Sequence, residues 1–94
     1  MERERILLEL ARRYVWWKAP EEAVRHPVHV LCQVMQLATY EDVERALSTL
    51  GEDAFRAALA AAPPGVLDDR SWTYWHLRLL GTAPPPLPRR EIGA

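Results

Sequence analysis

The residues that could do chemistry are three histidines, one cysteine and several pairs of acidic side chains. His26, His29 and Cys32 follow one another at intervals of three, a spacing that resembles a set of metal ligands. Pro27 disfavours helical geometry at His26, so that residue cannot continue the helix that carries the other two. Structural zinc normally takes four ligands in recognised pairs, and only His76 could complete this set. We therefore expect no metal and no cofactor.

Cys32 is the single cysteine and lies in the most apolar stretch of the chain. A nucleophilic thiol needs a base beside it and a lowered pKa, whereas apolar surroundings raise the pKa of a thiol. Cys32 is thus expected to be an inert core residue. A lone thiol favours a reducing compartment, and the first residues have the pattern of neither a signal nor a transit peptide. We expect a cytoplasmic protein.

Paired carboxylates could do acid/base work if a cleft perturbed their pKa values. Each pair in this chain lies at the start of a predicted helix, where the helix dipole favours acids. No phosphate-binding loop, dinucleotide fingerprint or zinc-protease motif accompanies them. The pattern predicts that the protein is not an enzyme. The pairs are Glu21-Glu22, Glu41-Asp42, Glu52-Asp53 and Asp68-Asp69.

The elements that must position these residues are all predicted to be helices. The chain has 94 residues, of which 49% are hydrophobic and 27% charged, which is the balance of one folded domain. Apolar residues recur at helical spacing in each candidate segment. The segments are residues 2–17, 21–26, 28–38, 40–50, 52–62 and about 69–80, and we expect an all-α, single compact bundle of about five helices. Residues 28–38 are expected to form its core helix.

Four residues are expected to mark helix ends. Thr39 can cap the helix that follows it, and Asp42, three positions later, can answer it as in a capping box. Ser71 can cap the last helix, and Gly51 and Gly81 are good residues to end one.

The character of the chain changes after Gly81, where four prolines fall within five positions. We expect a helical domain over residues 1–81 and an extended, proline-rich tail over residues 82–94. Pro86, Pro88 and Arg89 belong to a stretch that also fits the spacing read by polyproline-binding modules. An arm that orders on a partner is the preferred interpretation, and a frayed terminus is the alternative.

Aromatic and arginine residues of the kind that dominate protein interfaces are abundant. Trp16 and Trp17 are neighbours and cannot both face the core in the same way, so we expect at least one exposed aromatic patch. The acidic residues within 41–53 would steer a basic partner. The alternatives are that the aromatics fill the core and that the acids form a solvated face. The residues predicted to bind a partner are Trp16, Trp17, Tyr40, Glu41, Asp42, Glu44, Arg70, Tyr74, Pro86, Pro88 and Arg89.

Nucleic acid and membrane are disfavoured as partners. The formal net charge is -1, so no global field attracts polyanions. Residues 1–18 carry five basic against three acidic side chains, a weak patch, and the acidic residues 41–53 would make a poor recognition helix. The longest strongly apolar stretch, residues 30–38, is far too short to span a bilayer. A nucleic-acid-binding regulator that uses the arginine-rich first helix stays open as the alternative function.

The spacing of aromatic and turn residues resembles that of a family. The carrying motifs are Trp16-Trp17, Val34-Met35-Gln36-Leu37-Ala38-Thr39-Tyr40-Glu41-Asp42-Val43, Leu50-Gly51-Glu52-Asp53 and Arg70-Ser71-Trp72-Thr73-Tyr74-Trp75. They resemble small bacterial helical proteins encoded next to nucleotidyltransferase toxins of the abortive-infection AbiEii/AbiGii type. The likeness covers residues 14–81, with Ala38 where the family would have glycine.

This resemblance implies an antitoxin-like role, in which the chain binds a protein partner, a nucleotidyltransferase-type toxin, and neutralises it by direct contact. A non-catalytic interaction protein of another pathway stays open, as does a homo-oligomer. The resemblance implies no cofactor and no catalytic residue.

Overall fold

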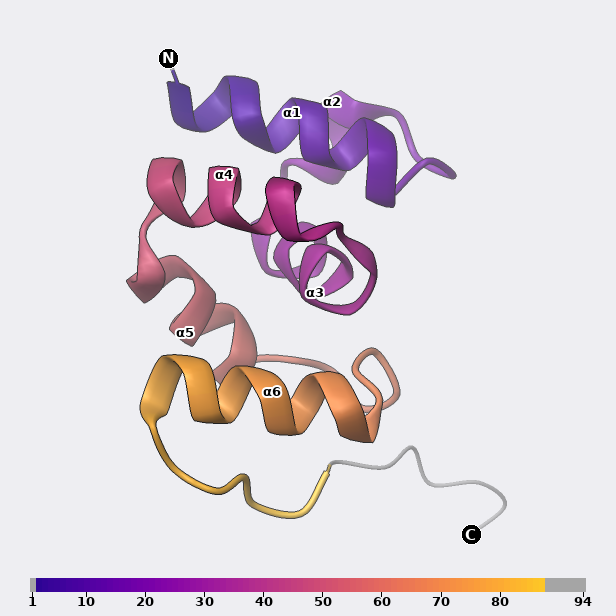
Figure 1. Cartoon of the computed structure of the whole chain (residues 1–94). Coiled ribbons are helices and arrows are strands. Elements are labelled where there is room, and N and C mark those ends of the chain that lie inside the picture. Colours follow the sequence, from indigo (N-terminus) through magenta and orange to yellow (C-terminus); the bar gives the residue numbers. More distant parts are fainter. Residues whose placement is uncertain (1, 88–94) are drawn as a thin grey trace, which may run out of the picture.

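The structure is a computed structural model that describes residues 2–87. It consists of helices and contains no strand within those residues (Figure 1). The helices are α1 (Glu2–Tyr14), α2 (Pro20–Ala23), α3 (Pro27–Leu37), α4 (Tyr40–Leu50), α5 (Glu52–Ala60) and α6 (Asp69–Leu80). The expected all-α class is confirmed. The expected number of about five is one too low, because each of the six segments with helical spacing forms a helix of its own.

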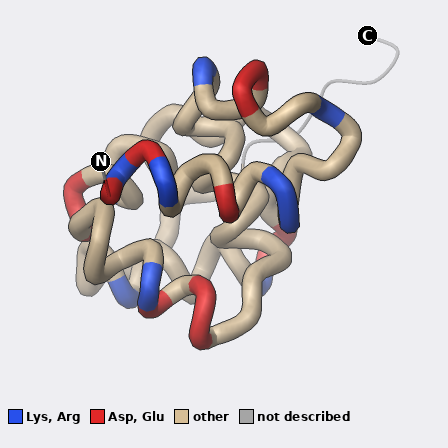
Figure 2. The backbone as a smooth tube through the Cα atoms, turned by 90° about the horizontal axis from the view of Figure 1, so that it is seen from above, with Lys and Arg blue, Asp and Glu red and all other residues tan. Residues whose placement is uncertain are grey.

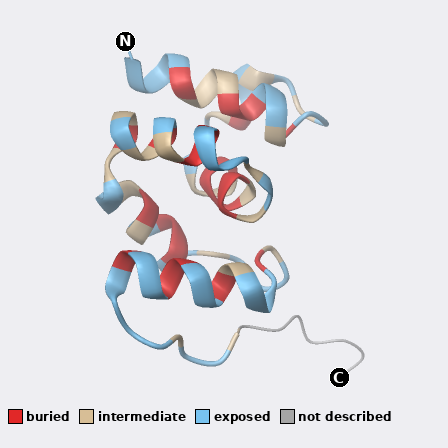
Figure 3. Cartoon of the chain, viewed as in Figure 1, coloured by how far each residue is buried: buried red, intermediate tan, exposed pale blue. Residues whose placement is uncertain are grey.

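Helix α3 is the centre of the fold. It packs against every other helix, and its residues Val30, Cys32 and Val34 have no exposed surface. Its polar residues, His29, Gln33 and Gln36, lie at the boundary of the core. This confirms the prediction that the most apolar stretch forms the core helix, and Figure 3 shows the buried residues gathered around it.

Helix α1 ends earlier than its apolar pattern predicts. The expected stripe ran to Trp17, but the helix ends at Tyr14, and residues 15–19 form the turn that leads to α2. The buried face of α1 and this turn consists of Ile6, Leu10, Ala11 and Val15. Both tryptophans are therefore outside the helix and outside the core.

The start of α4 is capped as predicted, but by a wider set of groups. The Asp42 amide N–H donates to Thr39 Oγ1 over 3.2 Å, which confirms Thr39 as the cap. The Asp42 carboxylate does not answer it, because that group is bound to α1 instead. The Tyr14 hydroxyl takes its place and accepts from the Thr39 amide N–H at 3.4 Å.

The start of α6 differs from the prediction. Asp68, not Ser71, is the capping residue, and its carboxylate accepts from the Ser71 amide N–H over 2.8 Å. Asp68 can do this because its backbone is extended and Gln36 Nε2 of α3 donates to the same carboxylate over 3.0 Å. Gly81 ends the helix with a left-handed φ of 68°, as expected of a terminal glycine.

Helix α6 carries two buried tryptophans that attach it to the rest of the molecule. Trp75 Nε1 donates to the Met35 carbonyl oxygen over 2.9 Å, and the Trp75 ring stacks on Phe55 at a centroid separation of 5.5 Å. Trp72 Nε1 donates to the Pro85 carbonyl oxygen over 2.8 Å. These bonds satisfy both indole N–H groups, as buried tryptophans require.

The described part of the predicted tail, residues 82–87, has no helix and runs back beside α6 (Figure 1). It contacts the domain through the Trp72–Pro85 bond and through Leu87, which packs against the core. Pro86 is exposed, whereas Pro88 and Arg89 lie outside the described residues. No helix within residues 2–87 has the length and hydropathy needed to cross a membrane.

Candidate functional site

The candidate site is a groove between α4 and α6. The two helices run in the same direction in Figure 1 but do not pack directly against each other. A cavity of about 270 Å³ lies between their first halves. Its lining residues are Met35, Ala38, Tyr40, Val43, Arg70, Ser71, Tyr74 and Trp75. We call this cavity and its lining the α4/α6 groove.

Three residues predicted to bind a partner meet at the α4/α6 groove. Tyr40 comes from the first position of α4, and Arg70 and Tyr74 come from the first half of α6. Tyr40 is 72% exposed and Tyr74 is 47% exposed, so both rings stand at the surface. The floor beneath them consists of the buried residues Met35, Val43 and Trp75. The groove therefore has an apolar floor, aromatic walls and one cationic side chain.

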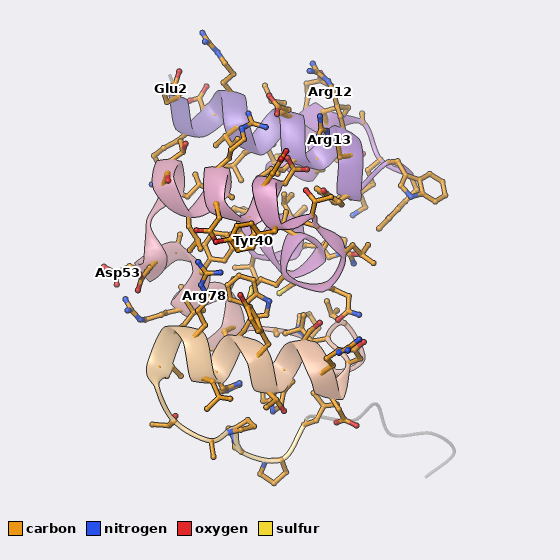
Figure 4. All side chains as sticks on the ribbon, viewed as in Figure 1. Glu2, Arg12, Arg13, Tyr40, Asp53 and Arg78 are labelled. Carbon is orange, nitrogen blue, oxygen red and sulfur yellow. The ribbon has the colours of Figure 1, made fainter. Side chains whose placement is uncertain are left out.

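Arg78 bridges α6 to α4 beyond the cavity. Its Nη2 donates to Glu44 Oε2 over 2.6 Å, and its Nη1 donates to the Tyr74 hydroxyl over 2.8 Å. The hydrogen bond that Arg78 donates to Glu44 is the main reason why the pKa of Arg78 is raised. Figure 4 shows Tyr40 and Arg78 in the space between the two helices. Sequence reasoning missed Arg78, although its position four residues after Tyr74 places both on one helix face.

Asp42 was predicted to be part of the partner-binding surface, and that prediction is wrong. It is 3% exposed, accepts from the Tyr14 hydroxyl over 2.6 Å and pairs with Arg13 Nη1 at 2.8 Å. The Tyr14 hydrogen bond and the arginines Arg13 and Arg45 hold the pKa of Asp42 below its usual value, against the opposing effect of burial. Asp42 joins α4 to α1 and is not available to a partner.

The acids of residues 41–53 are mostly neutralised within the chain. Asp42 pairs with Arg13, Glu44 with Arg78, and both Glu52 and Asp53 with Arg56 at 2.7 Å. Glu41 is the one acid of this stretch that makes no ion pair within residues 2–87. Acidic and basic segments accordingly alternate along the backbone in Figure 2. The stretch offers a basic partner much less negative charge than its composition suggested.

Trp16 and Trp17 form a second exposed surface. They are 75% and 49% exposed, and their rings meet edge to face with centroids 5.5 Å apart. The Trp17 ring also lies near His29 of α3, at 6.1 Å. Neither α1 nor α2 packs against α6, so the structure does not join this pair to the α4/α6 groove. The expectation of an exposed aromatic patch is confirmed.

A larger cavity, of about 370 Å³, lies between α1 and α4 and is lined mainly by polar and charged residues. Its charged groups already pair with one another, as in the 2.6 Å contact between Arg45 and Glu9. A partner that used these charged groups would first have to break the ion pairs between them. The smaller, apolar α4/α6 groove is therefore the better docking site.

Two of the residues considered for metal or nucleophilic chemistry, Cys32 and His76, are buried and hydrogen-bonded. Burial raises the pKa of Cys32 to about 11, and its Sγ donates to the Ala58 carbonyl oxygen at 3.6 Å. The predicted core position of Cys32 is thus confirmed, and its raised pKa agrees with the expectation of an inert thiol. Nδ1 of His76 donates to the Trp72 carbonyl oxygen over 2.8 Å, beneath the Trp72 ring. Within residues 2–87, no three His, Cys, Asp or Glu side chains are arranged to hold a metal ion.

The α4/α6 groove combines residues 35–43, from α3 and α4, with residues 70–75 of α6. Its floor is held by the bonds of Trp75, and Tyr74 in its wall is held by Arg78. Its geometry is that of a shallow binding site. Comparison with known protein families, with curated proteins and with solved structures finds no match to this chain.

Proposed function

We propose that this chain is a protein-binding module that holds a partner protein in the α4/α6 groove. The observation that carries this proposal is the meeting of Tyr40, Arg70 and Tyr74 above an apolar floor. Tyrosine and arginine are among the residues that contribute most to binding energy when they surround a desolvated pocket. Following the family resemblance in the sequence, we propose a nucleotidyltransferase-type toxin as the partner and an antitoxin-like role for the chain.

The open shape of the groove, together with its small volume, favours a protein partner over a small molecule. Sites for small ligands and cofactors usually enclose roughly 300–1,000 Å³ and bury most of the ligand. The α4/α6 groove has about 270 Å³ and is open to solvent on the side of Tyr40 and Tyr74. It suits one or two side chains presented by another protein. The aromatic rings around it would exclude water from that contact.

The floor of the groove is preorganised. Trp75 is held by its bond to the Met35 carbonyl oxygen and by the stack on Phe55, and Tyr74 is held by Arg78. A partner that binds such a floor loses less free energy to the ordering of side chains than one that binds a flexible surface. Neutralisation of a toxin would then follow from steric occlusion of the surface that meets the groove.

The test is co-expression with the product of the adjacent gene, which this proposal expects to be a nucleotidyltransferase-type toxin. We expect the two proteins to purify together and growth to be rescued. The double variant Tyr40→Ala/Tyr74→Ala should lose both effects because it removes the walls of the groove. Leu80→Ala is the matched control, since Leu80 is an exposed residue of α6 that does not line the cavity.

Two outcomes would count against the proposal. If no complex forms and growth is not rescued, the chain does not act as an antitoxin toward that toxin. If Trp16→Ala/Trp17→Ala abolishes the complex while Tyr40→Ala/Tyr74→Ala leaves it intact, the partner binds the other aromatic surface. Circular dichroism and thermal unfolding of each variant establish that the fold is retained.

A further inference from the structure

We propose that the α4/α6 groove recognises a short segment in which an apolar side chain lies next to a carboxylate. The apolar side chain enters the cavity, and the carboxylate pairs with Arg70. This inference deepens the proposed function and rests on it for the claim that a protein supplies the segment. It specifies the chemistry that the partner must present, whichever protein that partner is.

The apolar half of the recognition follows from the floor. Met35, Val43 and Trp75 are almost completely buried, and together with Ala38 they line the cavity with carbon atoms. The indole N–H of Trp75 is already bonded to Met35, so the floor offers an incoming group little hydrogen bonding. An apolar side chain that fills this space removes both surfaces from water, whereas a polar one leaves its own groups unsatisfied.

The acidic half follows from the charges. Arg70 is the one charged residue that lines the cavity, and it makes no ion pair within residues 2–87. Arg78, the other arginine of this face, is already neutralised by Glu44. Arginine binds carboxylates through paired N–H groups, which gives orientation as well as attraction. The groove therefore presents one uncompensated positive charge beside an apolar cavity.

The acids near this end of the groove do not take Arg70 as a partner. The Asp68 carboxylate lies close enough for Arg70 to contribute to its lowered pKa, but it is bonded to the Ser71 amide N–H and to Gln36. Asp69 and Glu41 do not line the cavity. Asp69 directly precedes Arg70 on α6 and projects about 100° away from it around the helix.

The direction of the two helices adds to this preference. Both α4 and α6 begin at the end of the groove that contains the cavity, since Tyr40 is the first residue of α4 and Arg70 the second of α6. The first turn of a helix carries partial positive charge on its N–H groups, which favours a nearby anion. The first turns of the two helices thus favour a carboxylate, as Arg70 does, although the capping side chains Thr39 and Asp68 occupy some of these N–H groups.

Blocked dipeptides titrated into the full-length, ¹⁵N-labelled protein provide the test. The probes are acetyl-Leu-Asp-amide, acetyl-Leu-Asn-amide and acetyl-Ala-Asp-amide. Binding should move the Trp75 indole and Ser71 amide signals. We expect Asn in place of Asp to weaken binding about threefold, as for a partly exposed ion pair, and Ala in place of Leu to weaken it about tenfold.

Variants separate the two halves of the recognition. Arg70→Gln should abolish the preference for Asp over Asn and keep the preference for Leu over Ala. Tyr40→Ala/Tyr74→Ala should weaken all three probes. Arg12→Gln is the control of matched charge change, because Arg12 is an exposed arginine of α1 outside the groove (Figure 4). It should leave every preference as in the unmodified chain.

The inference is overturned if the Asp and Asn probes bind equally well, or if the signals that move lie outside the groove. It is overturned as well if Arg12→Gln changes the Asp preference as much as Arg70→Gln does. Failure of the toxin to purify with the chain, with the probes still bound at the groove, would refute the antitoxin role and leave this inference standing.

Discussion

Asp42 is a carboxylate whose chemical environment comes from another helix. It faces α1, where Tyr14 and Arg13 bind it, and Tyr14 in turn accepts from the Thr39 amide N–H. One side chain of α1 thereby fixes both the cap and the first turn of α4. Buried carboxylates of this kind hold a fold together only while they remain ionised.

Replacement of Asp42 by Asn should lower the free energy of unfolding at pH 7 by about 2 kcal/mol, the usual contribution of a hydrogen bond to a charged group. The pKa of Asp42 is lowered in the folded state. Its stabilisation is therefore present at pH values above the pKa of an unfolded aspartate and is lost as pH falls through the folded pKa.

Urea unfolding at pH 7 and at pH 2.5 or so tests this linkage. The difference between the two proteins should shrink markedly at the lower pH, and an unchanged difference would contradict the linkage. Asp53→Asn is the control, since the Asp53 side chain is completely exposed and its loss should have little effect at either pH.

Cys32 should react with thiol reagents only when the fold opens. Its pKa of about 11 leaves little thiolate at pH 8, and its side chain has no exposed surface. We expect no reaction with Ellman's reagent in the native protein over minutes and complete reaction in concentrated urea. Rapid labelling without denaturant would mean that α3 is not the rigid centre of the molecule.

Helix α6 is the element that forms most of the candidate site, and its first turn is set by Asp68. This residue caps α6 and joins it to Gln36 of α3. It therefore fixes where α6 begins, and with it the positions of Arg70, Ser71 and Tyr74. The Arg78 bridge and Trp75 then hold the middle of the helix. A change at the cap should therefore affect both the stability of the fold and the shape of the groove.

Asp68→Ala should destabilise the protein by about 1 kcal/mol, as the loss of an N-cap does. Ser71→Ala should have a clearly smaller effect, because the cap uses the backbone N–H of Ser71, which alanine retains. Thermal and urea unfolding of both variants give the comparison. A larger effect of Ser71→Ala than of Asp68→Ala would contradict this assignment and indicate that the Ser71 side chain caps α6.

At the scale of the whole molecule, five helices are arranged around α3 and residues 82–87 cover part of α6. A domain of about this size buries only around 60–65% of the surface of its unfolded chain, so each covered aromatic matters to its stability. The short return segment shields Trp72 and supplies the acceptor for its indole N–H. It is thus part of the domain that it follows.

A chain ending at Gly81 should be less stable than the full chain by about 1–2 kcal/mol, since Trp72 loses a partly buried hydrogen bond and the core loses its contact with Leu87. Pro85→Ala retains the carbonyl oxygen and should change stability much less. Urea unfolding measures the difference, and hydrogen exchange of the Trp72 indole N–H should be faster in the shortened chain. Equal stability of the two chains would show that residues 82–94 do not support the fold.

Sequence patterns predicted the features that depend on residues close together in the chain. Helical spacing predicted the helices and the core role of α3, and the Thr39 cap could be read from residues next to it. The role of Asp42 could not, because its partner Tyr14 lies 28 positions away. Residue type predicts Tyr40 and Tyr74 as interface residues, but only the packing of α4 and α6 on α3 brings them to one groove. The role of Arg78 could not be predicted either, because its acceptor, Glu44, lies 34 positions away in the sequence.

Two of the four tryptophans are exposed and two are buried, so the intrinsic fluorescence of the chain reports on two separate surfaces. Trp16 and Trp17 face solvent, whereas Trp72 and Trp75 are buried along α6. Native fluorescence should therefore contain a red-shifted component that acrylamide quenches readily and a blue-shifted component that it barely reaches. Occupation of the groove would perturb the second component through Trp75, and contact at the α1–α2 turn would shield the first. A single spectrum could thus tell which face of the protein a partner covers.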